Sequence, residues 1–309
     1  MPAPHPALVH AALVLVSVLF GVNFVAMKRV LAHLPATDWA MYRIGAATLV
    51  LVPLTLLLAK RRRLPPARVM LWLVPAAILG VGANQLLFVM GLKLTSPAHS
   101  SVITATIPIL TLIAAVIARQ ERVTRRSALG ILLACAGAMI LLRADQLFAK
   151  DAAPLDHDTI VGDLLTVANA SGYAIYLVMM RKLGRDVEAP IATSICFVYS
   201  TLFVLPFGTG AFTESSVDAV LAPDVLPWAL YAVIGSTVLT YLLNVWALRH
   251  THSSQVAVYI SIQPVVATTL SLAMGAPSPE LRFYLAASLV LAGLGVNTVP
   301  QLLAARARA

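Results

Sequence analysis

The sequence contains little charge and almost no cysteine. Only 11% of its 309 residues are Asp, Glu, Lys or Arg, whereas 60% are hydrophobic. Because a soluble protein of this length needs far more polar surface, we predict a polytopic membrane protein. Cys135 and Cys196 are the only cysteines, and each lies inside an apolar run, which argues against a disulfide framework or a cysteine metal site.

Catalytic and nucleotide-binding motifs are also missing. The sequence has no phosphate-cradling glycine loop, no zinc-binding helix pair and no nucleophile elbow. All 13 acidic residues fall in connections or at the ends of apolar runs, the deepest being Asp38 and Asp163, so none is placed to relay protons at mid-membrane. We therefore expect no enzyme, no catalytic residue, no cofactor and no metal. The net charge of +9 comes from basic residues in short connections, which indicates membrane orientation and not nucleic-acid binding.

Ten apolar segments follow one another along the chain. Most are near 20 residues long, which favours membrane-spanning helices over the shorter alternating strands of a barrel. The predicted spans are 8–27, 39–58, 69–91, 98–118, 127–142, 160–180, 190–207, 225–248, 255–275 and 283–299.

The second half of the chain repeats the first at an offset of 156 residues. Thr95 and Pro108 reappear as Thr251 and Pro264, and the register holds without a gap from the 80s to about residue 140. We assign residues 1–143 to a first repeat, 144–159 to a linker and 160–309 to a second repeat. Five spans in each half would insert the two copies upside down relative to one another, as in many secondary transporters.

Basic residues predict the orientation. Of the 22 Lys and Arg residues, fifteen fall on one side of the alternating spans and six on the other, while Arg43 lies within a span. This bias predicts that both termini are cytoplasmic. We expect Arg43 to snorkel to the surface or to pair with Asp38, although it is also able to meet an anionic group.

Polar side chains recur at helical spacing inside several spans, which places them on single helix faces. Such groups either join helices through hydrogen bonds or line a polar cavity. Pro108 and Pro264 each remove a backbone donor inside an apolar run, and produce either static kinks or matching hinges at a central site. The predicted substrate-binding residues are Asn23, Gln85, Thr104, Asn169, Tyr173, Tyr176, Tyr241, Asn244, Tyr259 and Gln263.

Several short motifs stand out: Phe20–Lys28 at the end of the first predicted span, Tyr42-Arg43 in the second, and Gly162–Leu165 at the start of the second half. They resemble, in this order, the opening, the span 2 arginine and the second-repeat opening of the EamA members of the drug/metabolite transporter superfamily. Ile107-Pro108 with the later Glu121–Thr124, and Gln263-Pro264, resemble its paired proline segments. The chain departs from the pattern at 275–277, where Gly-Ala-Pro stands in place of Gly-Glu-Pro.

The resemblance implies an all-α fold of ten transmembrane helices, arranged as two inverted five-helix repeats around a central cavity. It also implies export of amino acids or similar small metabolites across the bacterial inner membrane by alternating access. Alternatives are an organelle-type carrier for phosphorylated metabolites or nucleotide sugars, and a non-transporting membrane scaffold. The expected partners are a small-molecule substrate and the lipid bilayer, without nucleic acid, for a monomer or homodimer.

Overall fold

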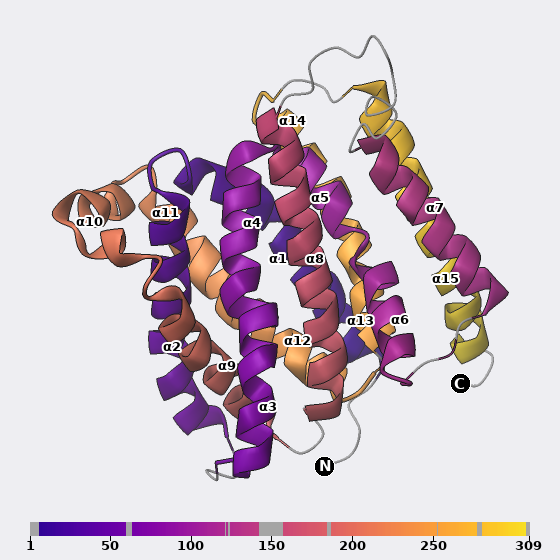
Figure 1. Ribbon diagram of the computed structural model, residues 1–309, viewed down its shortest axis with the longest axis horizontal. Helices are drawn as coiled ribbons and strands as arrows, with labels where there is room; N and C mark the ends of the chain where they lie inside the picture. The colour runs from indigo at the N-terminus through magenta and orange to yellow at the C-terminus, as the bar shows by residue number, and fades with distance from the viewer. Residues whose placement is uncertain are drawn as a thin grey trace.

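The computed structural model describes residues 6–59, 64–120, 122, 124–141, 157–183, 187–251, 253–276 and 280–306. Glu121 and most of the predicted linker lie outside these ranges, within which all regular secondary structure is helical (Figure 1). The first half contains α1 (Pro6–Val30), α2 (Ala36–Leu58), α3 (Ala67–Ala77), η1 (Ile78–Gly82), α4 (Ala83–Leu94), α5 (Pro97–Thr104), α6 (Ile107–Ile117) and α7 (Arg125–Leu141). The second half contains α8 (His157–Leu183), α9 (Ala189–Val204), η3 (Thr209–Phe212), α10 (Glu214–Leu221), α11 (Leu226–Leu230), η4 (Tyr231–Leu239), α12 (Thr240–Leu248), α13 (Ser253–Val258), η5 (Tyr259–Ile262), α14 (Gln263–Ala273) and α15 (Leu281–Arg306).

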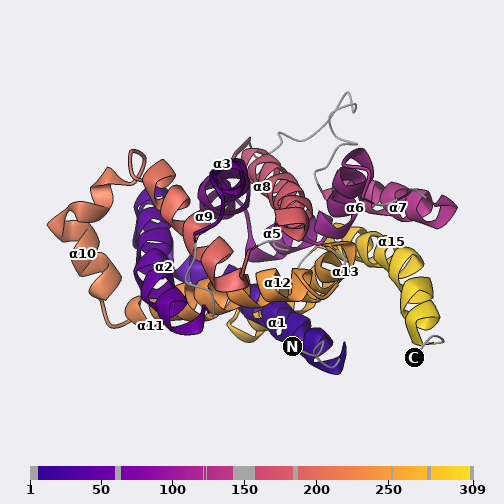
Figure 2. The same ribbon diagram turned by 90° about the horizontal axis from the view of Figure 1, so that it is seen from below.

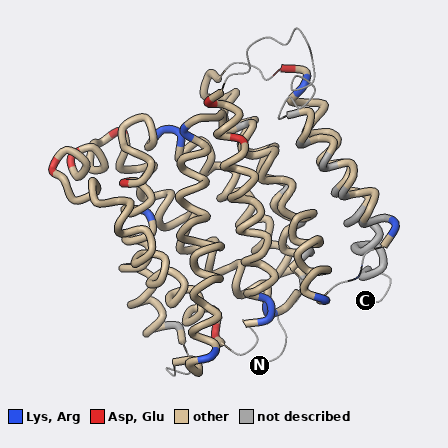
Figure 3. The backbone as a smooth tube through the Cα atoms, in the orientation of Figure 1, with Lys and Arg blue, Asp and Glu red and all other residues tan. Residues whose placement is uncertain are grey.

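Several of these helical segments are long and apolar enough to cross a membrane. They are Ala7–Val30, Ala36–Leu57, Ala67–Leu94, His99–Ile117, His157–Leu183 and Leu226–Leu248. Shorter apolar helices occur at Ala189–Val204 and Leu281–Gly293. Lys, Arg, Asp and Glu residues lie mostly towards the two ends of the bundle, and few lie in its middle (Figure 3). Length, hydropathy and charge distribution together establish a polytopic membrane protein.

Four segments depart from regular α geometry at corresponding places in the two halves. The π-helical segment η1 falls within the π-helical segment η4 when its bounds are shifted by 156 residues. The helix also breaks between α5 and α6, and a 3₁₀ turn, η5, separates α13 from α14. Pro108 and Pro264 therefore lie in the first turns of α6 and α14, where a missing N–H costs no hydrogen bond.

Close helix packing joins the two halves. Helix α4 of the first half runs against α8 of the second half, and they cross at Gly91 and Gly162. A Cβ on either glycine would lie 2.8 Å from the carbonyl oxygen of the other, so only glycine permits this backbone contact. Helix α1 packs in turn against α12, η4 and α14 of the second half.

Two pairs of helices lie at opposite sides of the bundle. Helices α7 and α15 pack against each other at one edge, and α2 packs against α9 towards the other (Figure 1). The view from below shows α10 projecting beyond α2, on the side away from α7 and α15 (Figure 2). The middle of the molecule is therefore formed by α1, α4, α5, α6, α8, α12 and α14.

Candidate binding cavity

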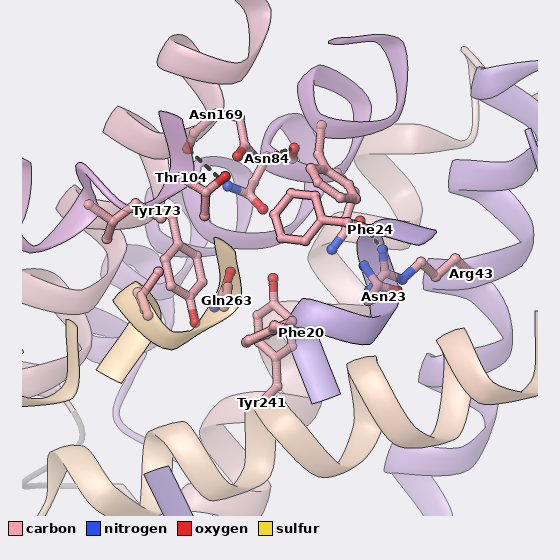
Figure 4. A pocket seen from close by; sticks show the side chains of 14 residues that line it. Phe20, Asn23, Phe24, Arg43, Asn84, Thr104, Asn169, Tyr173, Tyr241 and Gln263 are labelled. Carbon is pink, nitrogen blue, oxygen red and sulfur yellow. Dashed lines mark hydrogen bonds between the residues drawn. The ribbon is translucent and has the colours of Figure 1, made fainter. Parts of the chain in front are cut away.

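A cavity of about 460 Å³, which includes space open to the outside, lies between helices of both halves. Its walls come from α1, α2, α4, α5 and α6 and, in the second half, from α8, α12, η5 and α14. The lining side chains converge from these separate elements (Figure 4). They are Phe20, Asn23, Phe24, Arg43, Asn84, Gln85, Phe88, Thr104, Ile107, Asn169, Tyr173, Tyr241, Ile260 and Gln263.

Seven of the ten predicted substrate-binding residues line this cavity. They are Asn23, Gln85, Thr104, Asn169, Tyr173, Tyr241 and Gln263. The prolines are adjacent to it, because Pro108 follows the lining residue Ile107 and Pro264 follows Gln263. The two helix breaks therefore lie at the cavity wall.

The remaining three predicted residues lie outside the lining. Tyr176 is fully buried behind the wall, where its ring covers Gly80, and its hydroxyl has no hydrogen-bond partner among the described residues. The Asn244 amide donates to the Tyr173 hydroxyl at 2.9 Å, so it supports a lining side chain from behind. Tyr259 is only partly buried, and its hydroxyl lies 2.5 Å from Nδ1 of His10. Residues that share one face of a helix extend along more of the helix than the cavity does. The residues at the ends of such a stripe therefore lie outside the lining.

Arg43 neither snorkels to the surface nor pairs with Asp38, so these two expectations were wrong. Its side chain is fully buried, and Asp38 instead accepts a hydrogen bond from Ser216. Arg43 donates Nε–H to the Thr237 hydroxyl at 2.7 Å and Nη1–H to the Gln85 side-chain oxygen at 2.8 Å. The guanidinium thus joins α2 to α4 and η4 through neutral acceptors, and no described carboxylate bonds to it.

The two π-helical segments each receive a side-chain donor, at positions 156 residues apart. The Tyr241 hydroxyl donates to the Gly80 carbonyl oxygen at 2.8 Å. Arg43 donates Nη2–H to the Ser236 carbonyl oxygen at 3.3 Å and to its hydroxyl at 3.1 Å. Gly80 and Ser236 are 156 residues apart, and π geometry exposes backbone carbonyls to such donors. The irregular turns therefore fix two of the cavity's polar side chains.

Asn84 and Asn169 form a reciprocal link between α4 and α8. The Asn84 amide donates to the Asn169 carbonyl oxygen at 3.1 Å, and the Asn169 amide donates to the Asn84 carbonyl oxygen at 2.8 Å. Both side-chain nitrogens must point at these carbonyls, since a carbonyl only accepts. Each side-chain oxygen is consequently left available to the cavity that the two residues line.

Aromatic side chains supply much of the apolar wall, and the sequence analysis did not single out three of them. Phe24 packs edge-on against Phe88, with ring centroids 5.4 Å apart, and Phe20 packs edge-on against Tyr241 at 6.5 Å. Phe20 and Phe24 flank Asn23 in sequence, and Phe88 follows Gln85 by one helical turn. Their proximity to predicted polar residues is the only sequence signal for them, because phenylalanine also faces lipid.

A second polar cluster lies at one end of α4, α5 and α8. Asp163, which is buried, accepts a hydrogen bond from the Thr95 hydroxyl at 2.7 Å and lies 3.3 Å from Nδ1 of His99. The Lys28 ammonium donates to the carbonyl oxygens of Leu92 and Thr95 at 2.8 and 2.7 Å, at the end of α4. This cluster fastens helix ends. The described residues contain no group of three His, Cys, Asp or Glu side chains suited to a metal ion.

Comparison with known proteins gives the same family for both halves. The sequence pattern of the EamA-like transporter family matches residues 8–143 and again residues 160–299. The uncharacterized transporter YetK of Bacillus subtilis is 24% identical, over 90% of this chain and 83% of the relative. The Arabidopsis thaliana protein WALLS ARE THIN 1 is 27% identical, over 82% of this chain and 72% of the relative.

The fold also has a counterpart among solved structures. One crystal structure superimposes with a TM-score of 0.66, covering 96% of this chain and 98% of the other, at 17% sequence identity. At this level of identity the likeness concerns the fold alone.

Proposed function

Because this chain belongs to the EamA-like transporter family, we propose that it exports a small polar or amphipathic metabolite, such as an amino acid, across the bacterial inner membrane. The observation that carries the proposal is the cavity itself. It combines amide, hydroxyl and aromatic side chains from both halves of the chain. Nine of the fourteen lining residues carry polar groups, and polar groups that converge beside an aromatic wall can orient a small ligand.

We propose that the fold is a pair of inverted repeats with ten spans. Helix contacts support this layout, because they recur when the halves are exchanged. In this exchange α1 corresponds to α8, α4 to α12 and α6 to α14. The α4–α8 contact then matches the α12–α1 contact, and the α6–α8 contact matches the α14–α1 contact. Helix α2 corresponds to α9, and α7 corresponds to α15. The contacts α2–α9 and α7–α15 are therefore unchanged when the halves are exchanged. Such a layout places a substrate site where the repeats meet.

Alternating access would then consist of the two repeats rocking about the cavity. The breaks before Pro108 and Pro264 provide a hinge in each half, since a turn without its full set of hydrogen bonds bends more readily than a continuous helix. Both hinges adjoin lining residues, so bending there changes the cavity wall directly. The bias of basic residues supports cytoplasmic termini.

Counterflow into proteoliposomes tests the function. Vesicles containing the purified full-length chain are preloaded with one of the twenty amino acids and assayed for uptake of the same labelled compound. We expect saturable uptake for at least one amino acid, and none in vesicles without protein. Uptake restricted to sugar phosphates or nucleotide sugars would favour the organelle-type carrier, and uptake of none of these compounds would contradict transport of small metabolites.

A further inference from the structure

One side of the cavity presents hydrogen-bond donors. Arg43 donates Nη1–H to the Gln85 side-chain oxygen at 2.8 Å, so the Gln85 amide nitrogen is turned away from the guanidinium. The Ser236 hydroxyl, itself bonded by Arg43, donates to the Asn23 side-chain oxygen at 2.5 Å. The oxygens of both amides are therefore consumed, and their N–H groups remain for the cavity that they line.

The positive charge of Arg43 reinforces this donor side. The guanidinium is buried, and its recorded partners among the described residues are the hydroxyls, amide, carbonyl and sulfur of uncharged residues. Neutral partners satisfy its N–H groups but leave its net charge uncompensated. Because the surroundings have a low dielectric constant, this charge attracts an anionic group in the cavity more strongly than it would in water.

Another side of the cavity presents acceptors. The side-chain nitrogens of Asn84 and Asn169 each donate to the other residue's backbone carbonyl oxygen. Their side-chain oxygens therefore point away from these two hydrogen bonds. The Thr104 hydroxyl donates to the Ser100 carbonyl oxygen at 2.7 Å, which leaves only its lone pairs for a ligand. Asn84, Asn169 and Thr104 lie together in Figure 4, apart from Arg43 and Asn23.

From this arrangement we infer that the cavity is bipolar and selects a zwitterion with an apolar body. The substrate's anionic group binds on the side of Asn23, Gln85 and Arg43, and its ammonium binds on the side of Asn84, Thr104 and Asn169. The apolar body contacts the aromatic wall between them. The inference deepens the proposed function, on which it rests, by assigning the two charged groups of the substrate to opposite sides of one cavity.

Three probes with the same benzyl body separate the two sides. Phenylalanine carries both charges, phenylalaninamide keeps only the ammonium, and 3-phenylpropanoate keeps only the carboxylate. Binding to the purified full-length protein is measured by calorimetry, with the corresponding leucine series in parallel. We expect the zwitterion to bind at least about tenfold more tightly than either singly charged probe, because each lost charged hydrogen bond weakens binding by that order.

Substitutions on the two sides should act on different probes. Gln85→Glu keeps the hydrogen bond from Arg43 but neutralises its charge, so binding of the zwitterion and the anion should weaken about tenfold while binding of the cation strengthens. Thr104→Val removes one acceptor without breaking a link between helices, so binding of the zwitterion and the cation should weaken about threefold while the anion is unaffected.

Matched controls make the pattern decisive. Ser171→Ala removes a hydroxyl that also bonds its own helix, at the Val167 carbonyl oxygen, but lies outside the lining, and Arg29→Gln removes an exposed charge at the end of α1. Neither should change the binding of any probe. Equal weakening of all three probes by Gln85→Glu or Thr104→Val, or binding of neither series, would overturn the bipolar assignment. Binding with the expected pattern but without counterflow would sink the transport function alone, whereas counterflow without that pattern would sink the assignment alone.

Discussion

The two halves of this protein share their backbone irregularities but differ in the side chains that they present to the cavity. Positions 156 residues apart meet there as Gln85 and Tyr241, Thr104 and Ile260, and Ile107 and Gln263. In the second pair the first half supplies the polar member, and in the third pair the second half does. Corresponding positions of the two halves therefore reach the same cavity with side chains of unequal polarity.

This difference separates two requirements of a carrier. In the proposed mechanism, matched π segments and matched proline breaks would allow both halves to bend in the same way. Unequal side chains allow the cavity to hold one orientation of an asymmetric ligand. If the backbones of the halves match while their cavity side chains differ, substitutions in the backbone breaks and substitutions in the lining should have different effects on transport and on ligand affinity.

The largest effect should come from removing both helix breaks. Alanine at 108 and at 264 would restore a backbone donor, and proline disfavours a continuous helix by about 3 kcal/mol, so the unbroken form becomes accessible. We expect each single variant to slow counterflow about tenfold and the double variant about a hundredfold, with phenylalanine binding little changed. Pro53→Ala, in the interior of α2 and away from the cavity, serves as the control. A fall in only one of the single variants would show that the halves differ mechanically.

The next effect concerns the contact between α4 and α8. Gly91 has Ala247 as its counterpart at the offset of 156, so the second half tolerates a methyl group where the first half does not. Gly91→Ala would place Cβ 2.8 Å from the Gly162 carbonyl oxygen and should destabilise the protein by about 1–3 kcal/mol, measured as a lower Tm in detergent. In Gly45→Ala the new Cβ would lie 3.5 Å from its nearest neighbour, Met41, and should leave the Tm unchanged. Equal Tm values for the two variants would contradict the close-contact argument.

Exchanging one lining pair tests whether the position of a polar group matters beyond its presence. The double variant Ile107→Gln with Gln263→Ile keeps the composition of the cavity but moves the amide from α14 to α6. If the site holds one substrate orientation, phenylalanine affinity should fall about tenfold, since a buried amide that loses its ligand partner costs about that much. Calorimetry on the double variant and on each single variant measures this. Wild-type affinity in the double variant would indicate that the two copies are interchangeable.

Sequence reasoning grouped the residues that line the cavity better than it identified the contacts that hold them in place. Asn169 and Tyr173 lie four residues apart, and this helical spacing correctly placed both on one face. Arg43 could not be placed in the same way. Its partners Gln85 and Thr237 are 42 and 194 residues distant, so whether its charge snorkels or is buried depends on tertiary contacts that no local pattern contains. The π segments were missed for a similar reason, because their composition resembles that of any apolar helix.

The smallest effect compares two tyrosines of the second half that meet the same residue of the first. Tyr241 donates to the Gly80 carbonyl oxygen, whereas the ring of Tyr176 covers Gly80 and its buried hydroxyl has no partner among the described residues. Tyr241→Phe should therefore destabilise the protein by about 1 kcal/mol, while Tyr176→Phe should leave it unchanged or slightly more stable, because removing an unsatisfied buried hydroxyl relieves its desolvation cost. Thermal unfolding in detergent distinguishes the two, with phenylalanine binding measured alongside. Equal losses of stability would mean that the Tyr176 hydroxyl also has a hydrogen-bond partner, and that the deep tyrosines of the second half are held alike.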